Sequence, residues 1–262
     1  MPRQRVALVT GATGGLGEAL CRQLVQAGYR VLAHGRRCGP LEALCADIGA
    51  KMFVADLEDV DQIRHLADGV GETCSSVDLV VNNAGLGYGK PGGKRRVSAS
   101  GFESHLAVNA VAPFLLTSAL STFVARNGVV INVGSTNQRV LVPPDWNFER
   151  QFDGASAYQQ SKAALIILSL IQAEQLSARS IRLHVVHPGT RLPTRMVFES
   201  GTTPLTPLAV GVATVLTAAR TRVGSGPMFI TPDDKTALSN IADRTVAPSL
   251  LAFLKRRLSG FE

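Results

Sequence analysis

Short apolar runs alternate along this 262-residue chain with longer segments that have a helical pattern. Several runs are almost continuously apolar, which is typical of strands that are covered on both faces. Strands that alternate with helices predict a doubly wound parallel sheet. The predicted strands are 5–10, 30–33, 51–55, 78–82, 128–133, 181–186 and 228–231, and the predicted helices are 15–27, 40–48, 59–72, 101–126, 156–179 and 206–221.

Nothing in the sequence divides the chain, which shows no repeat, no low-complexity linker and no break in composition. Hydrophobic residues make up 45% of it, so it can form a sizeable core and is not disordered in general. We therefore expect one α/β domain over residues 1–262, with about seven strands and with helices on both faces of the sheet. The stretches with the least regular pattern are 86–100, 136–154 and 190–206.

The charges favour the positive sign, with 27 Lys and Arg against 20 Asp and Glu and a formal net charge of +7. The basic residues are scattered, and their densest groups lie at 94–96 and 255–257. With three Tyr and one Trp, the chain has little surface on which single-stranded nucleic acid could stack. We expect a solvated basic surface and no nucleic-acid partner, with a phosphorylated small molecule as the main alternative.

Two features favour a cytoplasmic location. The four cysteines form no C-x-x-C pair, which is typical of thiols in a reducing compartment. The first apolar run leads straight into a glycine-rich motif, which does not fit a cleavable signal peptide.

Two segments raise the question of membrane binding. The uncharged run 106–125 is long enough to span a bilayer, but its polar residues, among them Asn109, favour a helix buried against protein. Segment 250–258 is basic and amphipathic, and we favour packing against the domain or a partner subunit over binding to a membrane surface.

A glycine-rich motif follows the first predicted strand and precedes the first predicted helix, with the pattern Thr-Gly-x3-Gly-x-Gly at 10–17. Backbone N–H groups in such a turn approach a pyrophosphate closely, and the helix N-terminus favours its charge. The strand–turn–helix context predicts a Rossmann-type dinucleotide site. A glycine-rich turn without a ligand is the alternative. The candidate cofactor-binding residues in the turn are Gly11, Thr13, Gly14, Gly15, Leu16 and Gly17.

The end of the second predicted strand indicates which dinucleotide binds. A site that prefers NAD usually places Asp or Glu there for the ribose 2′-hydroxyl. This chain instead has Arg36 and Arg37 and no carboxylate. Because Arg can bind a 2′-phosphate bidentately, we predict NADP(H), with Arg36 favoured over Arg37 and a solvated arginine pair as the alternative.

Further motifs follow the ends of later strands, where open α/β sheets bind ligands. Asn-Asn-Ala-Gly at 82–85 ends the fourth strand, Ser135 follows the fifth, and Pro-Gly at 188–189 follows the sixth. The helix between the last two begins near Tyr158, and Lys162 lies four residues on, so the two side chains share one helix face.

These motifs, in this order, resemble the short-chain dehydrogenase/reductase family over roughly residues 5–190. Asp56 after the third strand and Asn109 in the long helix also fit the family pattern. The resemblance implies hydride transfer between a nicotinamide and a CH–OH or carbonyl group. It implies cofactor contacts by Asp56, Leu57, Asn83, Ala84, Gly85, Tyr158, Lys162, Pro188, Gly189 and Thr190, with Asp56 and Asn83 on the adenosine side.

The resemblance also assigns roles to four candidate catalytic residues. Tyr158 would be the general acid of reduction or the base of oxidation, and Lys162 would lower the phenol pKa and hold the nicotinamide ribose. Ser135 would bind the substrate oxygen, and Asn109 would hold a water in a proton relay.

The chain departs from the family pattern in two places. Ser135 and Tyr158 are 23 residues apart, longer than is usual, and the extra material looks like the retinol-dehydrogenase-like branch. Its aromatic residues Trp146, Phe148 and Phe152 either line an apolar substrate pocket or pack within a surface flap. In segment 190–206, which we expect to be a mobile lid, Thr190 and Thr194 compete for the nicotinamide contact, and the nearby Arg191 and Arg195 could bind an acidic substrate.

The sequence therefore predicts an NADPH-dependent reductase of a small or medium ketone or aldehyde. Alcohol oxidation, isomerisation or cyclisation at the same site is one alternative, and an NADPH-binding interaction protein without turnover is another. We expect no metal site, since no metal-ligand spacing occurs. Helices 101–126 and 156–179 are apolar on more than one face, which predicts a homodimer or homotetramer.

Overall fold

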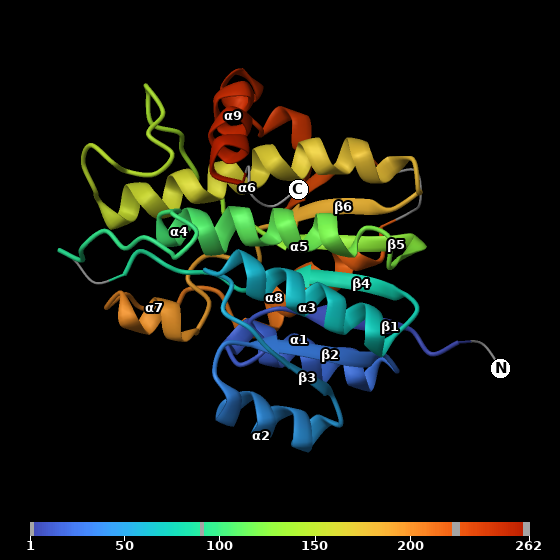
Figure 1. Ribbon diagram of the computed structural model, residues 1–262. Helices are drawn as coiled ribbons and strands as arrows, with labels where there is room; N and C mark the ends of the chain where they lie inside the picture. The colour runs from blue at the N-terminus through green and yellow to red at the C-terminus, as the bar shows by residue number, and fades with distance from the viewer. Residues whose placement is uncertain (1–2, 90–91, 222–225, 259–262) are drawn as a thin grey trace.

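An eight-stranded sheet forms the centre of the computed structural model, which describes residues 3–89, 92–221 and 226–258 (Figure 1). The strand order is β3-β2-β1-β4-β5-β6-β7-β8, and all neighbours are parallel except β7 and β8. The described strands are β1 Val6–Val9, β2 Arg30–Gly35, β3 Lys51–Val54, β4 Val77–Asn82, β5 Val124–Val133, β6 Arg182–Val186, β7 Met228–Ile230 and β8 Lys235–Ala237. The predicted doubly wound sheet is confirmed, and the short, partly exposed β8 has no apolar run by which it could have been predicted.

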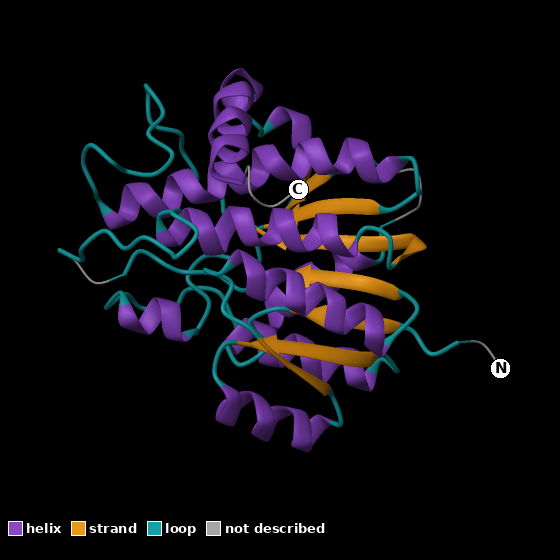
Figure 2. Cartoon of the chain, viewed as in Figure 1, coloured by secondary structure: helices purple, strands orange, loops and turns teal. Residues whose placement is uncertain are grey.

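Helices cover both faces of the sheet, as Figure 2 shows. Helices α1, α2 and α8 pack on one face, and α3, α5 and α6 pack on the other. The described helices are α1 Gly15–Gln26, α2 Cys38–Ile48, α3 Val60–Thr73, α4 Ser104–Leu106, α5 Ala112–Leu120, α6 Gly154–Ser177, α7 Arg195–Glu199, α8 Leu208–Ala219 and α9 Ala247–Leu258, with 3₁₀ turns at Leu238–Asn240 and Arg244–Val246.

The two-sided burial explains the continuous apolar runs. In β1, Ala7 and Val9 belong to the core under α1, whereas Val6 and Leu8 belong to the core under α3. Side chains alternate between the two faces of a strand, so a strand between two helical layers needs apolar residues at every position.

The predicted helix 101–126 is broken in the structure. Its middle part is α4, a π-helical turn over Ala107–Val111 and α5, and the chain then turns at 121–123. The prediction was wrong for 124–126, which belong to β5, because Val124 pairs with Val77 and is buried. Within the described ranges, no helix has the length and apolar character needed to cross a membrane.

The C-terminal helix α9 covers the outer side of α6. Leu250 and Leu254 are buried in one cluster with Leu165 and Leu168 of α6, in keeping with the expectation that this segment packs against the domain (Figure 1). Helix α9 therefore covers part of the apolar surface of α6, one of the two helices from which we predicted oligomers. Parts of the predicted 1–262 domain (1–2, 222–225 and 259–262), and residues 90–91 of the 86–100 stretch, lie outside the described residues.

Candidate active site

The predicted site residues meet at one edge of the sheet, where the parallel strands end. The glycine turn follows β1, the two arginines follow β2, Asp56 and Leu57 follow β3, Asn83 to Gly85 follow β4, Ser135 follows β5 and Pro188 to Thr190 follow β6. Strand order reverses between β1 and β4, so the edge contains the crevice at which open α/β sheets bind ligands. In Figure 1 the loops of this edge lie on the left.

Helix α6 places Tyr158 and Lys162 beside Ser135, and all three are buried. Burial raises the pKa of Tyr158 to about 12, against the opposing effect of a hydrogen bond with the Ser135 hydroxyl. Burial lowers the pKa of Lys162 to about 8. At neutral pH the phenol is therefore protonated and the amine is largely charged.

The Lys162 ammonium donates a hydrogen bond to the Val133 carbonyl oxygen at 2.8 Å and lies 5.9 Å from the centre of the Tyr158 ring. We expected this ammonium to lower the pKa of the phenol, but in this structure burial outweighs every other influence on Tyr158. The protein alone thus holds Tyr158 as a proton donor.

Asn109 connects the loop after β4 to α6. Its Oδ1 accepts from the Leu86 N–H at 2.8 Å, and its Nδ2 donates to the Leu86 carbonyl oxygen at 3.0 Å and to Ser161 Oγ at 2.9 Å. It lies in the π-helical turn, a distortion that is frequent at functional sites. A Cβ on Gly85 would lie 3.2 Å from Asn109 Oδ1 and 3.7 Å from Lys162 Nζ, so glycine allows this close packing.

The glycine turn is fixed against the loop after β4. Gly11 has φ +65°, and a Cβ there would lie 2.8 Å from Ala84 Cα. Asn83 Nδ2 donates to the Thr10 carbonyl oxygen at 2.9 Å and to that of Gly11 at 3.2 Å. A Cβ on Gly17 would lie 2.2 Å from the Gly11 carbonyl oxygen. The conformation of the turn therefore requires glycine at positions 11 and 17, and the Asn83 side chain stabilises the turn through its two hydrogen bonds.

The start of α1 suits an anionic group. Its N-cap residue, Gly14, has no side chain to bond the first N–H groups of the helix. Such N–H groups, together with the helix dipole, favour a phosphate. The turn thus fits the pyrophosphate of a dinucleotide.

Two guanidinium groups lie at the end of β2, where the ribose 2′-position of a dinucleotide is recognised. Arg36 and Arg37 are exposed, and Arg36 Nη1 is 4.0 Å from Asp56 Oδ2. Thr13 lies beside Gly35, since a Cβ on that glycine would be 3.3 Å from Thr13 Cγ2. This end of the site fits a 2′-phosphate.

Segment 190–206 crosses the glycine turn and contains the unexpected helix α7. Thr194 Cγ2 would be 3.2 Å from a Cβ on Gly15, and a Cβ on Gly87 would overlap Met196. Of the two competing threonines, Thr194 therefore lies over the turn, while Thr190 Oγ1 is 3.4 Å from His187 Nε2.

The 136–154 insertion packs its own aromatic residues. Trp146 and Phe148 are buried, and Trp146 Nε1 donates to Ser249 Oγ of α9 at 3.1 Å. Phe152 is half-buried, with its ring centre 6.0 Å from that of Phe148. Of the two interpretations of this insertion, packing within a flap agrees with the buried positions of Trp146 and Phe148.

Three further features of this edge were not predicted from the sequence, namely Tyr88, His34 and the pair Glu103–His105. The ring centres of Tyr88 and Tyr158 are 4.5 Å apart. His34 is buried at the end of β2, with Nε2 3.1 Å from the Ala55 carbonyl oxygen. Tyr88 lies in an irregular, glycine-rich loop, and neither spacing nor periodicity indicates which of its residues turns inward.

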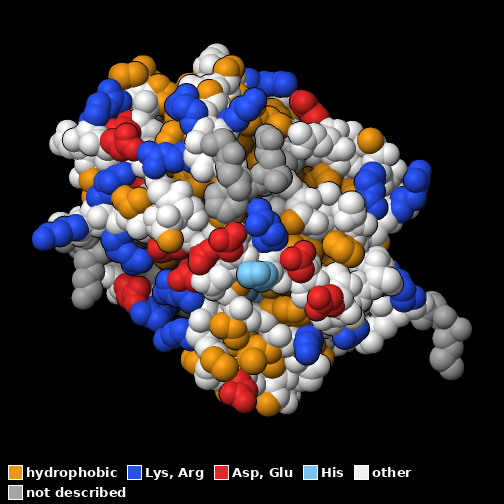
Figure 3. Space-filling view, viewed as in Figure 1, with side chains coloured by type: hydrophobic (Ala, Val, Ile, Leu, Met, Phe, Trp, Pro, Cys, Tyr) orange, Lys and Arg blue, Asp and Glu red, His pale blue; other side chains and the backbone are white. Residues whose placement is uncertain are grey.

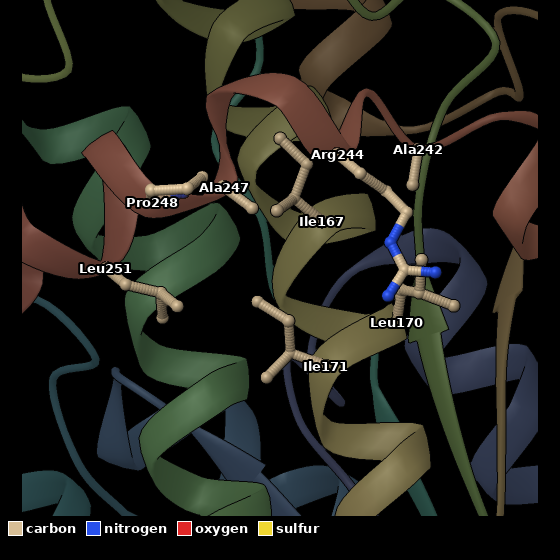
Figure 4. A pocket seen from close by; sticks show the side chains of 8 residues that line it. All are labelled: Ile167, Leu170, Ile171, Ala242, Arg244, Ala247, Pro248 and Leu251. Carbon is tan, nitrogen blue, oxygen red and sulfur yellow. The ribbon is translucent and has the colours of Figure 1, made fainter.

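Two surfaces lie outside this edge. Basic and acidic side chains are interspersed on the face in Figure 3, in line with the scattered charges of the sequence. An apolar pocket of about 340 Å³ lies between α6 and the C-terminal segment, with Ile167, Ile171 and Leu251 in its lining (Figure 4).

The chain is similar in sequence and in fold to known proteins. The sequence profile of the short chain dehydrogenases matches residues 5–204. Nodulation protein G of a Rhizobium species is 36% identical over 189 residues, which cover 71% of this chain and 72% of that protein. The NADP-dependent 3-hydroxy acid dehydrogenase YdfG of Shigella flexneri is 32% identical over 189 residues, 70% of this chain and 71% of that protein. The active-site complex of Pseudomonas aeruginosa RhlG with NADP superposes with a TM-score of 0.70 at 25% identity, over 87% of this chain and 94% of that one.

Proposed function

This chain belongs to the short-chain dehydrogenase family and is an oxidoreductase, and we propose that it reduces a ketone or aldehyde with hydride from NADPH. The observation that carries the proposal is a buried phenol, Tyr158, beside Ser135 and Lys162 at the same sheet edge as the glycine turn, where burial raises its pKa to about 12. A phenol that keeps its proton at neutral pH is suited to be the acid of a reduction.

The proposed cofactor is NADP(H), whose nicotinamide supplies or accepts the hydride. The turn from Gly11 to Gly17 would hold the pyrophosphate, and Arg36 and Arg37 would hold the 2′-phosphate. The remaining proposed contacts are Asp56, Leu57, Asn83, Ala84, Gly85, Pro188, Gly189 and Thr190, which all follow strands at this edge.

The proposed catalytic roles follow from the atoms that meet there. The Ser135 hydroxyl binds the substrate oxygen, and the Tyr158 hydroxyl gives its proton to that oxygen as negative charge develops. The Lys162 ammonium donates to the Val133 carbonyl oxygen in this structure and would hold the nicotinamide ribose. Asn109 fixes the loop after β4 against α6 and would serve the proton relay beyond Lys162.

A coupled test separates the possible activities. Ketones, aldehydes and alcohols are offered to the protein with NADPH, NADH and their oxidised forms, and absorbance at 340 nm and the products are followed. We expect net NADPH consumption with a carbonyl substrate and little with NADH. Product formed without net consumption would instead show isomerisation or cyclisation, and tight NADPH binding without any product would show a binding protein.

The remaining proposals concern assembly and location. We expect a homodimer or homotetramer, supported by the apolar pocket between α6 and α9, where Leu251 is 39% exposed. A single species of monomer mass in light scattering would contradict this. The free thiols Cys21, Cys38, Cys45 and Cys74 support the cytoplasm as the location.

A further inference from the structure

A buried ion pair lies one loop away from the catalytic tyrosine. Glu103 caps the start of α4, where its Oε2 accepts from the N–H groups of His105 at 2.9 Å and Leu106 at 3.1 Å. Its Oε1 is 2.7 Å from His105 Nδ1, and Glu103 is only 1% exposed. On the other side of the ring, His105 Nε2 is 2.8 Å from the Gly87 carbonyl oxygen.

This arrangement favours the charged form of His105. Nε2 faces a carbonyl oxygen, which can only accept, and Nδ1 faces a Glu103 carboxyl oxygen, which accepts when that group is ionised, so an imidazolium with its two N–H donors satisfies both contacts. The charged groups that act on the ring are Glu103 and Glu58, and Glu58 itself pairs with Arg96 at 3.2 Å. Burial alone would lower the pKa of His105, but Glu103, the Gly87 carbonyl and Glu58 raise it above its usual value.

The carbonyl held by His105 immediately precedes Tyr88. The Tyr88 ring lies against the Tyr158 ring, with 4.5 Å between the ring centres and an angle of 60° between the ring planes. The Tyr88 hydroxyl accepts from Asn137 Nδ2, and the Asn137 backbone N–H donates to Ser135 Oγ at 3.0 Å. The backbone next to Tyr88 is thus hydrogen-bonded to α4, and the Tyr88 hydroxyl is hydrogen-bonded to the segment that follows β5.

Packing leaves Tyr88 little freedom while leaving its ring accessible. A Cβ on Gly154, the first residue of α6, would lie 2.6 Å from the Tyr88 carbonyl oxygen. Tyr88 is 37% exposed, whereas Tyr158 is 8% exposed. The outer phenol therefore covers part of the inner one and is itself open to solvent.

We propose that Tyr88 is a positioning residue that orients Tyr158 and forms a wall of the substrate site, and that the Glu103–His105 ion pair holds it there. The proposal rests on the proposed function for its effect on turnover. Without the ion pair, the loop 86–89 loses its anchor, and the Tyr158 hydroxyl loses the orientation that proton transfer requires. The expected kinetic effect is a fall in kcat, with little change in the affinity for NADPH.

The test uses two variants of the ion pair. Glu103→Gln keeps an oxygen that can cap α4 but removes the charge that stabilises the imidazolium, and His105→Gln removes the ring. His65→Gln is the matched control, because His65 is exposed on α3. For both ion-pair variants, we expect faster hydrogen exchange of the Leu86 amide, which donates to Asn109 Oδ1 at the start of this loop, and a fall in kcat of about 10- to 100-fold.

A readout that needs no turnover separates this proposal from the proposed function. The chain has three tyrosines, so ¹³C-tyrosine NMR can follow the titration of Tyr158 directly. We expect both ion-pair variants, and Tyr88→Ala, to move the pKa of Tyr158 from about 12 toward its ordinary value, while Tyr88→Phe keeps most of the shift. If the wild type turns over no carbonyl but these NMR and exchange changes occur, the proposed function fails and the positioning role stands.

Two results would overturn the proposal. Exchange of the Leu86 amide at the wild-type rate in both folded ion-pair variants would show that the pair does not hold the loop. An unchanged Tyr158 titration in Tyr88→Ala, which alters a partly exposed side chain, would show that Tyr88 does not position Tyr158.

Discussion

Arg36 and Arg37 are the side chains that bear on the choice between NADP(H) and NAD(H). They are exposed at the end of β2, and Arg36 has one carboxylate, Asp56, at 4.0 Å. The weak, solvent-screened pair leaves the guanidinium able to turn to a 2′-phosphate.

Arg36→Ala should therefore weaken NADPH binding by about 10- to 100-fold, the value of one or two charge-assisted hydrogen bonds. The NADH dissociation constant should stay unchanged in the same variant. Calorimetric titration with both dinucleotides measures the effect, and Arg22→Ala, on the outer side of α1, is the control. Equal losses for NADPH and NADH would contradict the assignment.

Lys162 gives the site its pH dependence. Burial lowers its pKa to about 8, so the ammonium is present below that pH and is lost as the pH rises through it. The Tyr158 phenol remains protonated over this range. In the reductive direction, kcat/KM should be level near neutral pH and fall by about tenfold per pH unit well above 8. Lys162→Gln should have low activity without this decline, and a wild-type rate that rises between pH 8 and 9 would be inconsistent with the proposed role.

At the scale of elements, the glycine turn and α1 form a unit that requires two glycines. A Cβ at position 17 would meet the Gly11 carbonyl oxygen at 2.2 Å and Asn83 Nδ2 at 2.6 Å. Gly17→Ala should lower the free energy of unfolding by about 1–3 kcal/mol and abolish tight dinucleotide binding. Gly39→Ala, in α2, has no neighbour within 4 Å and should leave both unchanged or slightly raise stability. Urea unfolding and NADPH titration measure both effects. Equal stability and equal NADPH affinity of the two variants would refute the requirement for glycine at position 17.

The elements also show where sequence reasoning succeeds. The glycine turn and Ser135 follow strands, and Tyr158 and Lys162 lie four residues apart near the start of a helix, so the sequence could predict that all of them meet at one edge of the sheet. The break of 101–126 could not be predicted, because the π-helical turn, α5 and Val124 of β5 share one uncharged, apolar stretch. An apolar stretch of this kind indicates that the residues are buried, but it does not indicate whether they form a helix or a strand.

At the scale of the whole molecule, α9 joins parts that are far apart in the sequence. Its apolar side covers α6, Ser249 bonds Trp146 of the insertion, and Arg257 Nη1 donates to the Gly101 carbonyl oxygen at 2.8 Å. Such long-range contacts leave no periodic signal, which is why the sequence could not choose between a pocket and a flap for the insertion.

Leu254→Ala should cost about 2–5 kcal/mol of unfolding free energy, since Leu254 is 3% exposed in the cluster between α9 and α6. Lys255→Ala, on the same helix but exposed, should change it by within about 1 kcal/mol. Chemical denaturation of both variants provides the comparison. Similar costs for the two would mean that α9 does not pack on α6 as described.

The central claim is that the Tyr158 hydroxyl delivers the proton in a carbonyl reduction. Its most direct test is the rate of NADPH oxidation by Tyr158→Phe with a carbonyl substrate that the wild type accepts. The account predicts a loss of about 100-fold or more in kcat, with the dissociation constant of NADPH nearly unchanged. Turnover by Tyr158→Phe at the wild-type rate would contradict it.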